Sequence, residues 1–322
     1  MELLRLFPVL CGCLIGAAQV WAQTYPARPI KVIVPMQAGT AGDSIMRIVA
    51  EQISASIGQP LIIVNLTGAA GLIGAERITH APPDGYTIGA MSDSMLAVVP
   101  HLQPRINFDP LDGFEPVSTV ASITSVLVVS PLLPARNIDE LAALARLRPG
   151  TLDFASGGIG SQQHLAMAVF SDATGISLNH VPFRGASQAV TEVVAGRIPV
   201  MFVALSIALP FIKDGRLRAI AVASKSRSAL LPDVPTVSES ALPGFVFTPW
   251  VAIYAPKGTP KQIVERLHRE TAAAVQVSEV RSRLLALGLE PETMTPAELN
   301  QRTRDDYARM GKLFRASGIK NE

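Results

Sequence analysis

Residues 30–57 read IKVIVPMQAGTAGDSIMRIVAEQISASI, which is a short apolar strand, a turn of small residues and an amphipathic helix. The strand is rich in β-branched residues and stops at Pro35, which cannot donate a hydrogen bond to a sheet. In the helix, isoleucine or valine recurs every three or four residues, at positions 45, 48, 49, 53 and 57. This order predicts that the helix packs one face against the sheet.

The turn before this helix favours an anion. Asp43 or Ser44 can cap the helix, and Gly58 can end it. A strand, a tight turn and a helix start together direct free backbone N–H groups and the positive end of a helix dipole at one point. We interpret that point as half of a carboxylate site, with a second lobe of the chain supplying the other half.

The first 22 residues have the three parts of a secretory signal peptide. Arg5 supplies the positive charge, residues 6–18 form an apolar segment, and the small-x-small sequence at 20–22 is a cleavage site. No later segment is long and apolar enough to predict a membrane span. We therefore expect a periplasmic protein, with a lipid anchor at Cys13 as a minor alternative.

Composition narrows the function classes. Both cysteines lie in the signal segment, so the mature chain can form no disulfide, thiolate metal site or cysteine nucleophile. A length of 322 residues usually means two domains. The net charge is +2, without a long run of one sign, and aromatic residues make up 5%, which argues against a nucleic-acid partner.

Short β-branched runs alternate with helical patterns along the whole mature chain, which predicts an α/β fold with mostly parallel sheets. Ligands of such sheets bind outside the carboxyl ends of the strands, where the loops 35–43 and 92–94 fall. We expect the chain to cross between two lobes at 118–130 and to return at 217–223. The predicted divisions are a signal peptide at 1–22, a discontinuous first lobe at 23–124 and 223–322, and a second lobe at 125–222.

The second lobe repeats the strand, glycine turn and helix start twice, at 154–161 and 181–187. One such turn is ordinary in an α/β protein, but three on two facing lobes favour a ligand. Backbone N–H groups and hydroxyls are neutral donors, so they can bind a carboxylate and release it, whereas an arginine clamp holds it more strongly.

Enzyme hypotheses have little support in the sequence. Ser161, His164 and an acid such as Asp43 can be imagined as a hydrolase triad, but a serine at a helix start more often caps the helix and the histidine more often packs. The sequence at 158–163 begins like a dinucleotide fingerprint and lacks its third glycine. The five histidines show no metal-ligand spacing.

Six strings of the mature chain resemble the Bug-type (TctC-like) substrate-binding proteins of tripartite tricarboxylate transporters. They follow the family's order and are TYPARPI (24–30), APPDGYT (81–87), SGGIGSQQHL (156–165), HVPFRG (180–185), LPDVPT (231–236) and APKGTP (255–260). The resemblance implies a periplasmic-binding-protein type II fold, in which two α/β lobes joined by two crossing strands close on a small organic acid.

The resemblance also implies how the acid is held: the first loop and the second-lobe loops form a pincer around one carboxylate, partly through ordered waters. It implies no cofactor and no metal, and delivery of the acid to membrane transporter subunits. Carried over by position, the ligand-binding residues are Met36, Gln37, Ala38, Gly39, Thr40, Ala41, Gly42, Ser92, Ser94, Ser156, Gly157, Ser161, Gln162, Phe183, Gly185, Ser187 and Val203.

The chain departs from the family pattern in two places that bear on the ligand. The first loop of the family usually reads P-F-x-P-G-G-x-x-D, and here Met36, Ala38 and Thr40 replace the phenylalanine, the second proline and the second glycine. Val203 stands where the family often has an aspartate that faces the cleft. We therefore expect a plain mono- or dicarboxylate, including one with an apolar or aromatic body, and no α-amino acid bound through an acidic partner at this position.

Two other functions stay open at this point. A periplasmic sensor that presents its closed form to a membrane receptor kinase would have the same sequence features. The hydrolase based on Ser161 and His164 predicts turnover of esters, whereas a binding protein predicts none. We expect a monomer, because the charged residues are of mixed sign and polar residues alternate along the chain.

Overall fold

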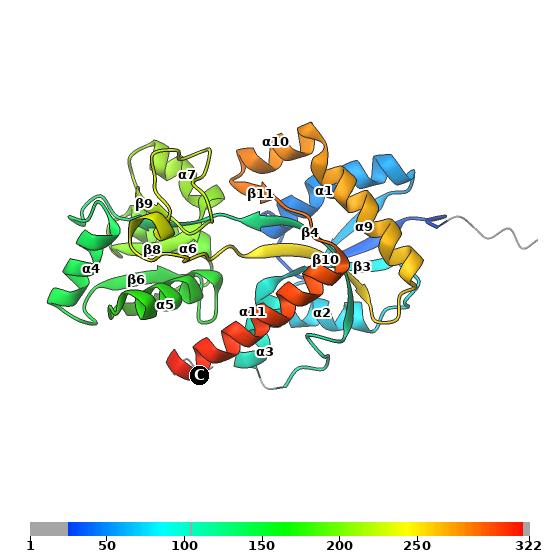
Figure 1. The fold of residues 1–322 in the computed structure, drawn as a ribbon, viewed down its shortest axis with the longest axis horizontal. Coiled ribbons are helices and arrows are strands. Elements are labelled where there is room, and N and C mark those ends of the chain that lie inside the picture. Colours follow the sequence, from blue (N-terminus) through cyan, green and yellow to red (C-terminus); the bar gives the residue numbers. More distant parts are fainter. Residues whose placement is uncertain (1–24, 104, 318–322) are drawn as a thin grey trace, which may run out of the picture.

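The computed structural model describes residues 25–103 and 105–317 of the 322-residue chain. These residues form two α/β lobes that lie side by side, and β4 (Phe114–Ile123) and β10 (Trp250–Pro256) approach the junction between them (Figure 1). The expected signal peptide, with Cys13, lies outside the described residues. Among the helices of the described part, none has the length and apolar character that a membrane span requires.

In the described part of the chain, the first lobe has six strands in the order β11-β4-β10-β3-β1-β2. β1 pairs in parallel with β2 and β3, so the loops that follow these strands meet at one edge of the sheet. β10 is antiparallel to both β3 and β4. The further elements of this lobe are β1 (Ile30–Val34), α1 (Ala41–Ile57), β2 (Leu61–Asn65), η1 (Ala69–Gly71), α2 (Leu72–Thr79), β3 (Thr87–Ser92), the π-helical η2 (Ser94–Val98), α3 (Val99–Leu102), α9 (Lys261–Gln276), α10 (Ser278–Ala286), β11 (Leu289–Pro291) and α11 (Pro296–Ser317).

The second lobe has five described strands in the order β7-β6-β8-β5-β9. β6 is parallel to β7 and β8, whereas β5 is antiparallel to β8 and β9. The sheets are therefore mixed rather than mostly parallel, because the strands at and after each crossing are antiparallel to the strands of the βαβ units.

The elements of the second lobe are β5 (Ser125–Val129), α4 (Ile138–Leu147), β6 (Asp153–Ser156), α5 (Gln162–Thr174), β7 (Asn179–Pro182), α6 (Ala186–Val194), β8 (Val200–Ala204), α7 (Leu205–Lys213), β9 (Arg218–Val222) and α8 (Val237–Ser240).

The crossings differ from the expected ones. The expected single strand at 118–130 is two strands, because β4 ends in the first sheet, Thr124 follows it, and β5 begins in the second sheet. The segment 217–223 is not the return crossing: it contains β9, which pairs with β5 inside the second lobe. Phe245 and Phe247 then join the core of that lobe, and the chain returns where β10 begins. We therefore propose that the second lobe extends to residue 249 rather than 222.

The opening strand, turn and helix form as expected, but the cap differs. Helix α1 buries isoleucine and valine side chains against the first sheet, in a core with residues of β1 and β10. Its N-cap is Thr40, whose hydroxyl accepts a hydrogen bond from the Asp43 N–H, so neither Asp43 nor Ser44 is the cap. Gly58 ends the helix in a left-handed conformation, as the sequence predicts.

The lobes also contact each other beside the crossing strands. On the side of α11 and α5, Val98, Met310 and Phe314 share one hydrophobic core with Leu165 of the second lobe (Figure 1). On the side of α10 and α7, the loop after α10 is in van der Waals contact with the start of α7, since a Cβ added at Gly288 would lie 3.1 Å from the Leu205 Cβ. These contacts fix the walls of the space between the lobes.

Candidate functional site

A cavity of about 740 Å³ lies between the lobes and is lined by residues of both. Four helices contribute their N-terminal turns to its wall: α1 from the first lobe, and α5, α6 and α7 from the second. The first amides of an α-helix have no partner within the helix, so these turns offer hydrogen-bond donors and positive dipole ends. Among the described lining residues, Arg184 carries the one charge and none is acidic. This combination suits an anion.

The first loop is held by a network centred on Asp43, which is 2% exposed. Its carboxylate accepts hydrogen bonds from the Gly39 N–H, the Arg47 Nε and the Asn65 Nδ2, each at 2.9 Å. Asn65 also donates to the Met36 carbonyl at 3.0 Å. Gly39 has a φ of +80°, a conformation that glycine adopts without strain. The network therefore ties the loop to α1 and to the end of β2.

In the second lobe, two loops touch closely behind the cavity. A Cβ added at Gly157 would lie 3.0 Å from the Ala186 N and 3.1 Å from the Gln163 Oε1. A side chain at position 157 would force the loop after β6 and the N-terminus of α6 apart by a few tenths of an ångström, so glycine suits this close approach. The contact keeps the starts of α5 and α6 next to each other, which places their lining residues on one wall.

A stacked histidine pair supports the loop after β6. The rings of His164 and His180 lie 3.9 Å apart, nearly parallel, and the Ser156 Oγ is 2.6 Å from the His180 Nε2. Burial lowers the pKa of both imidazoles, and His180 lowers that of His164 further, to about 4. Both rings are therefore neutral at pH 7. Ser156 is fully buried, and its hydroxyl contacts the histidine pair that supports the loop rather than the cavity.

The geometry at Ser161 contradicts the hydrolase arrangement. Its hydroxyl accepts a hydrogen bond from the backbone N–H of His164 at 3.3 Å, as an N-cap does. The Nδ1 of the His164 ring accepts instead from the Gly160 N–H at 3.1 Å, and the ring is 8% exposed. The serine caps α5 and the histidine packs, so the pair is not set up for proton transfer.

Replacing Ser161 with alanine is expected to remove this cap and lower the free energy of unfolding by about 1 kcal/mol. Chemical denaturation of both proteins measures the change. Ser161→Asn keeps a side-chain oxygen that caps helices well and is the matched control, with a smaller loss expected. An alanine variant as stable as the wild type would contradict the capping role.

Most of the residues predicted from the sequence meet at the cavity. Those that line it are Met36, Gln37, Ala38, Gly39, Thr40, Ala41, Gly42, Ser92, Ser94, Gln162, Gly185 and Ser187. The others, Ser156, Gly157, Ser161, Phe183 and Val203, do not line it. Val203 is 1% exposed and packs in the core of the second lobe, while the next residue of β8, Ala204, lines the cavity.

Sequence reasoning missed the fourth helix start and one whole wall. The missed lining residues are Ser44, Ile123, Gln163, Gln188, Ala204, Ser206, Ile207, Val251, Leu287 and Leu289. Sequence reasoning predicted no helix start directly after β8, whereas α7 begins at Leu205, at the end of that strand. The usable signal was the alternation of strands and helices in the second lobe. Each turn from a strand to a helix in that lobe lies at the same sheet edge as the two glycine turns, so the turn after β8 belongs there as well.

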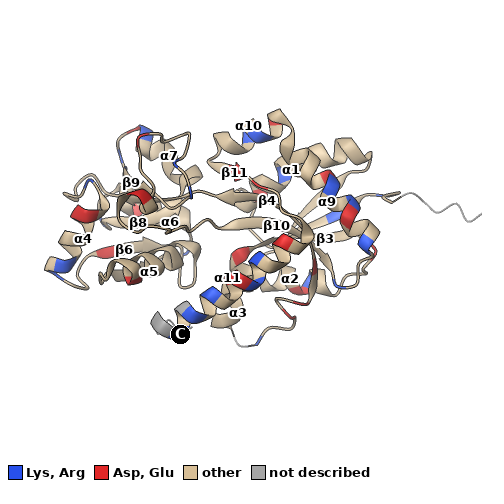
Figure 2. Cartoon of the chain, in the orientation of Figure 1, with Lys and Arg blue, Asp and Glu red and all other residues tan. Residues whose placement is uncertain are grey.

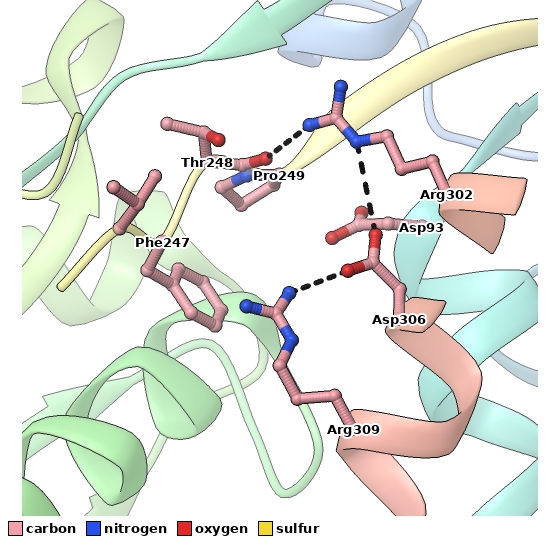
Figure 3. Close-up of a pocket in the computed structure, with 8 residues that line it drawn as sticks. Asp93, Phe247, Thr248, Pro249, Arg302, Asp306 and Arg309 are labelled. Atoms are coloured by element: carbon pink, nitrogen blue, oxygen red, sulfur yellow. Dashed lines mark hydrogen bonds and ion pairs between the residues drawn. The ribbon is translucent and has the colours of Figure 1, made fainter. Parts of the chain in front are cut away.

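A second, smaller cavity of about 220 Å³ lies where the chain returns to the first lobe (Figure 3). Asp306 of α11 accepts hydrogen bonds from the Trp250 Nε1 at 2.8 Å and from Arg309 at 2.6 Å. Asp93, which follows β3, faces this group and accepts a hydrogen bond from the Gln162 Nε2 at 3.2 Å. Because Gln162 belongs to the second lobe and lines the large cavity, this bond connects the two lobes beside the ligand space.

Away from the cavities, charged side chains are spread over the outer helices. Figure 2 shows both signs on α4, α9, α10 and α11. The described residues contain no group of three or more His, Cys, Asp or Glu side chains that could hold a metal ion. The large cavity is lined instead by helix starts, neutral side chains and Arg184.

Comparison with known proteins assigns this architecture to a family. The sequence model described as "Tripartite tricarboxylate transporter family receptor" matches residues 45–319. Protein BugT of Bordetella pertussis is 37% identical over 325 residues, with 99% of each chain covered. A protein of Pseudomonas sp. strain P51, described as lying in the tcbD-tcbE intergenic region, is 39% identical over 90% of this chain and 86% of its own.

Solved structures of similar proteins support the same family assignment. Rpa4515 of R. palustris with adipate has a TM-score of 0.83 at 28% identity and covers 92% of this chain and 100% of its own. MatC of Rhodopseudomonas palustris with bound malate has a TM-score of 0.78 at 29% identity, with 90% and 99% covered. The expected resemblance and the expected two-lobe fold are confirmed. The chain belongs to the tripartite tricarboxylate transporter receptor family, the TctC or Bug-type periplasmic binding proteins.

Proposed function

We propose that this protein captures a small organic carboxylate between its lobes in the periplasm and delivers it to a transporter of the tripartite tricarboxylate type. The observation that carries the proposal is the interlobe cavity, whose lining, among the residues that the structure describes, holds four helix N-termini and no acidic side chain. Amides and hydroxyls can surround a carboxylate without fixing it permanently, which suits a protein that must release its ligand.

The relatives support this proposal. Two similar structures carry adipate and malate, which are both carboxylates. The family description names a receptor of a transporter, and that description supports membrane transporter subunits as the partner. Periplasmic location fits the family and the signal peptide expected from the sequence.

An α-amino acid ligand is disfavoured. An ammonium group needs an acidic or carbonyl partner, and no acidic residue is among those that line the cavity in the described structure. At the end of β8, Ala204 lines the cavity and Val203 is buried, so this strand supplies no carboxylate. Succinate is therefore expected to bind more tightly than aspartate in calorimetric titrations, and the reverse order would contradict this part of the proposal.

A charge placed at one helix start tests the anion site directly. Ser187 lies in the first turn of α6 and lines the cavity. Ser187→Asp is expected to weaken carboxylate binding at least 30-fold, or about 2 kcal/mol, because two negative charges then meet in the cleft. Aspartate near a helix N-terminus stabilises the helix, so the fold should be retained. Ser187→Asn, which is neutral and of similar size, is the control and should change affinity less than fivefold.

The measurement starts with ligand-free protein. The mature chain is unfolded in guanidinium, released compounds are identified by mass spectrometry, and the protein is refolded. Its Tm is then measured with mono-, di- and tricarboxylates, and with amino acids and sugars as controls. A ligand at 100 times its Kd adds about 2.7 kcal/mol of stability, which shifts the Tm by several degrees. If no carboxylate raises the Tm, or if Ser187→Asp and Ser187→Asn bind equally, the proposed function is wrong.

A further inference from the structure

One wall of the large cavity is apolar and contiguous. Leu289 of β11 pairs with Ile123 of β4 and both border the cavity, but Leu289 is fully buried and Ile123 is 6% exposed, so the surface open to a ligand on this side comes from Ile207 and Leu287. Ile207, in the first turn of α7, lines it from the second lobe. The loop after α10 carries Leu287, and its contact with α7 at Gly288 brings these side chains to the same side of the cleft. We call Ile123, Ile207, Leu287 and Leu289 the apolar wall.

The apolar wall includes a side chain that is unusually open to solvent. Leu287 is 40% exposed and is one of six exposed large hydrophobic residues in the described part of the chain. When an apolar group covers a solvent-exposed leucine in a cavity, apolar surface is removed from water and the free energy falls. The wall is therefore suited to the body of a ligand rather than to a second polar group.

Apart from Ser206, which is next to Ile207 at the start of α7, the polar donors lie in other segments. Thr40 and Gly42 belong to the start of α1, and Gly185 and Ser187 to the start of α6. Arg184, the one charged lining residue, is in the same loop as Gly185. The positively charged side chain thus lies at the α6 end of the cavity, and the apolar wall contributes no charged side chain.

We propose that the ligand is a monocarboxylate with a bulky apolar body, such as an arylalkanoate or a cycloalkane carboxylate, whose body packs on the apolar wall. This inference rests on the proposed function. A linear dicarboxylate in the same orientation would place its second charged group against Leu287, whose apolar side chain offers it no hydrogen-bond partner. An apolar body instead replaces water there and covers the exposed leucine.

The ligand class is tested by titration of the ligand-free mature chain. The probes are 3-phenylpropanoate, cyclohexanecarboxylate, adipate and succinate, together with the neutral 3-phenylpropanamide. We expect the two monocarboxylates to bind at least tenfold more tightly than adipate and succinate, and the amide to bind at least tenfold more weakly than 3-phenylpropanoate. If a linear dicarboxylate binds most tightly, the ligand class is wrong while the proposed function stands. If no acid binds, or if the amide binds as well as its acid, the proposed function itself fails.

A pair of matched variants tests the apolar wall. Leu287→Gln is expected to weaken binding of 3-phenylpropanoate at least fivefold and to leave any binding of succinate within twofold. The control is Leu147→Gln, at a leucine that is 77% exposed on α4 and does not line the cavity, and it should change neither affinity. Equal effects of Leu287→Gln on both acids would show that the body of the ligand does not contact this wall. Chemical denaturation of each variant confirms that the fold is retained.

Discussion

Replacing Asp43 with asparagine is expected to lower the free energy of unfolding by about 3 kcal/mol and to weaken carboxylate binding about 100-fold. The buried carboxylate accepts hydrogen bonds from Gly39, Arg47 and Asn65. An amide has one acceptor oxygen and turns two N–H donors toward the same partners, so at least one buried donor loses its acceptor. The loop from Met36 to Gly42, which lines the cavity, then loses the bond that holds Gly39 in place.

Arg47→Gln is the matched control for this variant. The guanidinium is half exposed, and its removal leaves the bonds from Gly39 and Asn65 to the carboxylate intact. Because Arg47 is the exposed partner of the pair, this variant should lose much less stability than the asparagine variant and bind ligand within threefold of the wild type. Urea denaturation and calorimetric titration measure both quantities. If the Asp43 variant behaves like the Arg47 variant, the carboxylate does not organise the loop.

The pH dependence of the same residue has a definite sign. Burial alone would raise the pKa of Asp43, but hydrogen bonds from Arg47, Asn65 and Gly39 and the charge of Arg47 outweigh it and lower the pKa. The stability that the ionised group contributes is present at neutral pH and is lost as the pH falls below about 4, the ordinary range of an aspartate. The asparagine variant should therefore lose less stability than the wild type on acidification.

Local patterns were sufficient for most elements and for much of the candidate site. The spacing of isoleucine and valine from 45 to 57 predicted helix α1, and Gly58 ends it as expected. Glycine turns before helices pointed to three of the four helix starts at the cavity. These features depend on residues close together in the chain, where side-chain periodicity and turn chemistry act directly.

The features that were missed depend on distant contacts. The return crossing could not be located, because 217–223 and 247–255 are both apolar runs and only pairing with β5 or β4 distinguishes them. Val203 was the residue of β8 predicted to line the cavity, whereas its neighbour Ala204 lines it. The sequence could not distinguish the two, since a strand buried on both faces shows no alternation of polar and apolar residues. The apolar wall joins the start of α7 to β11 across the two lobes, a contact that no local pattern encodes.

Asparagine in place of Asp93 is expected to raise the Tm at pH 8 by several degrees and to leave the Tm at pH 5 nearly unchanged. Burial, and then the charge of Asp306, raise the pKa of Asp93 to about 7, against the opposing effects of the Ser94 N–H, Gln162 and Arg302. Arg309 also faces this cavity and is paired with Asp306. The asparagine oxygen can still accept the Gln162 bond, so the link between the lobes is kept.

The sign follows from the two states of the chain. In the unfolded chain an aspartate has a pKa of about 4, so between about pH 4 and 7 the folded protein holds a proton that the unfolded chain has lost. This contribution to stability is complete below pH 4 and is lost as the pH rises through 7, by at most about 4 kcal/mol for three pKa units. The neutral asparagine loses nothing over the same range, so the difference in Tm should grow from pH 5 to pH 8.

Measuring the Tm of both proteins at half-unit steps of pH tests this. Asp112→Asn, at an exposed carboxylate, controls for the loss of one negative charge. Since Ser92 and Ser94 on either side of Asp93 line the ligand cavity, ionisation of Asp93 should also weaken carboxylate binding in the wild type between pH 6 and 8, and not in the asparagine variant. A difference in Tm that stays constant from pH 5 to 8 would mean that Asp93 does not titrate in this range. The predicted effect of pH on carboxylate binding would then be wrong as well.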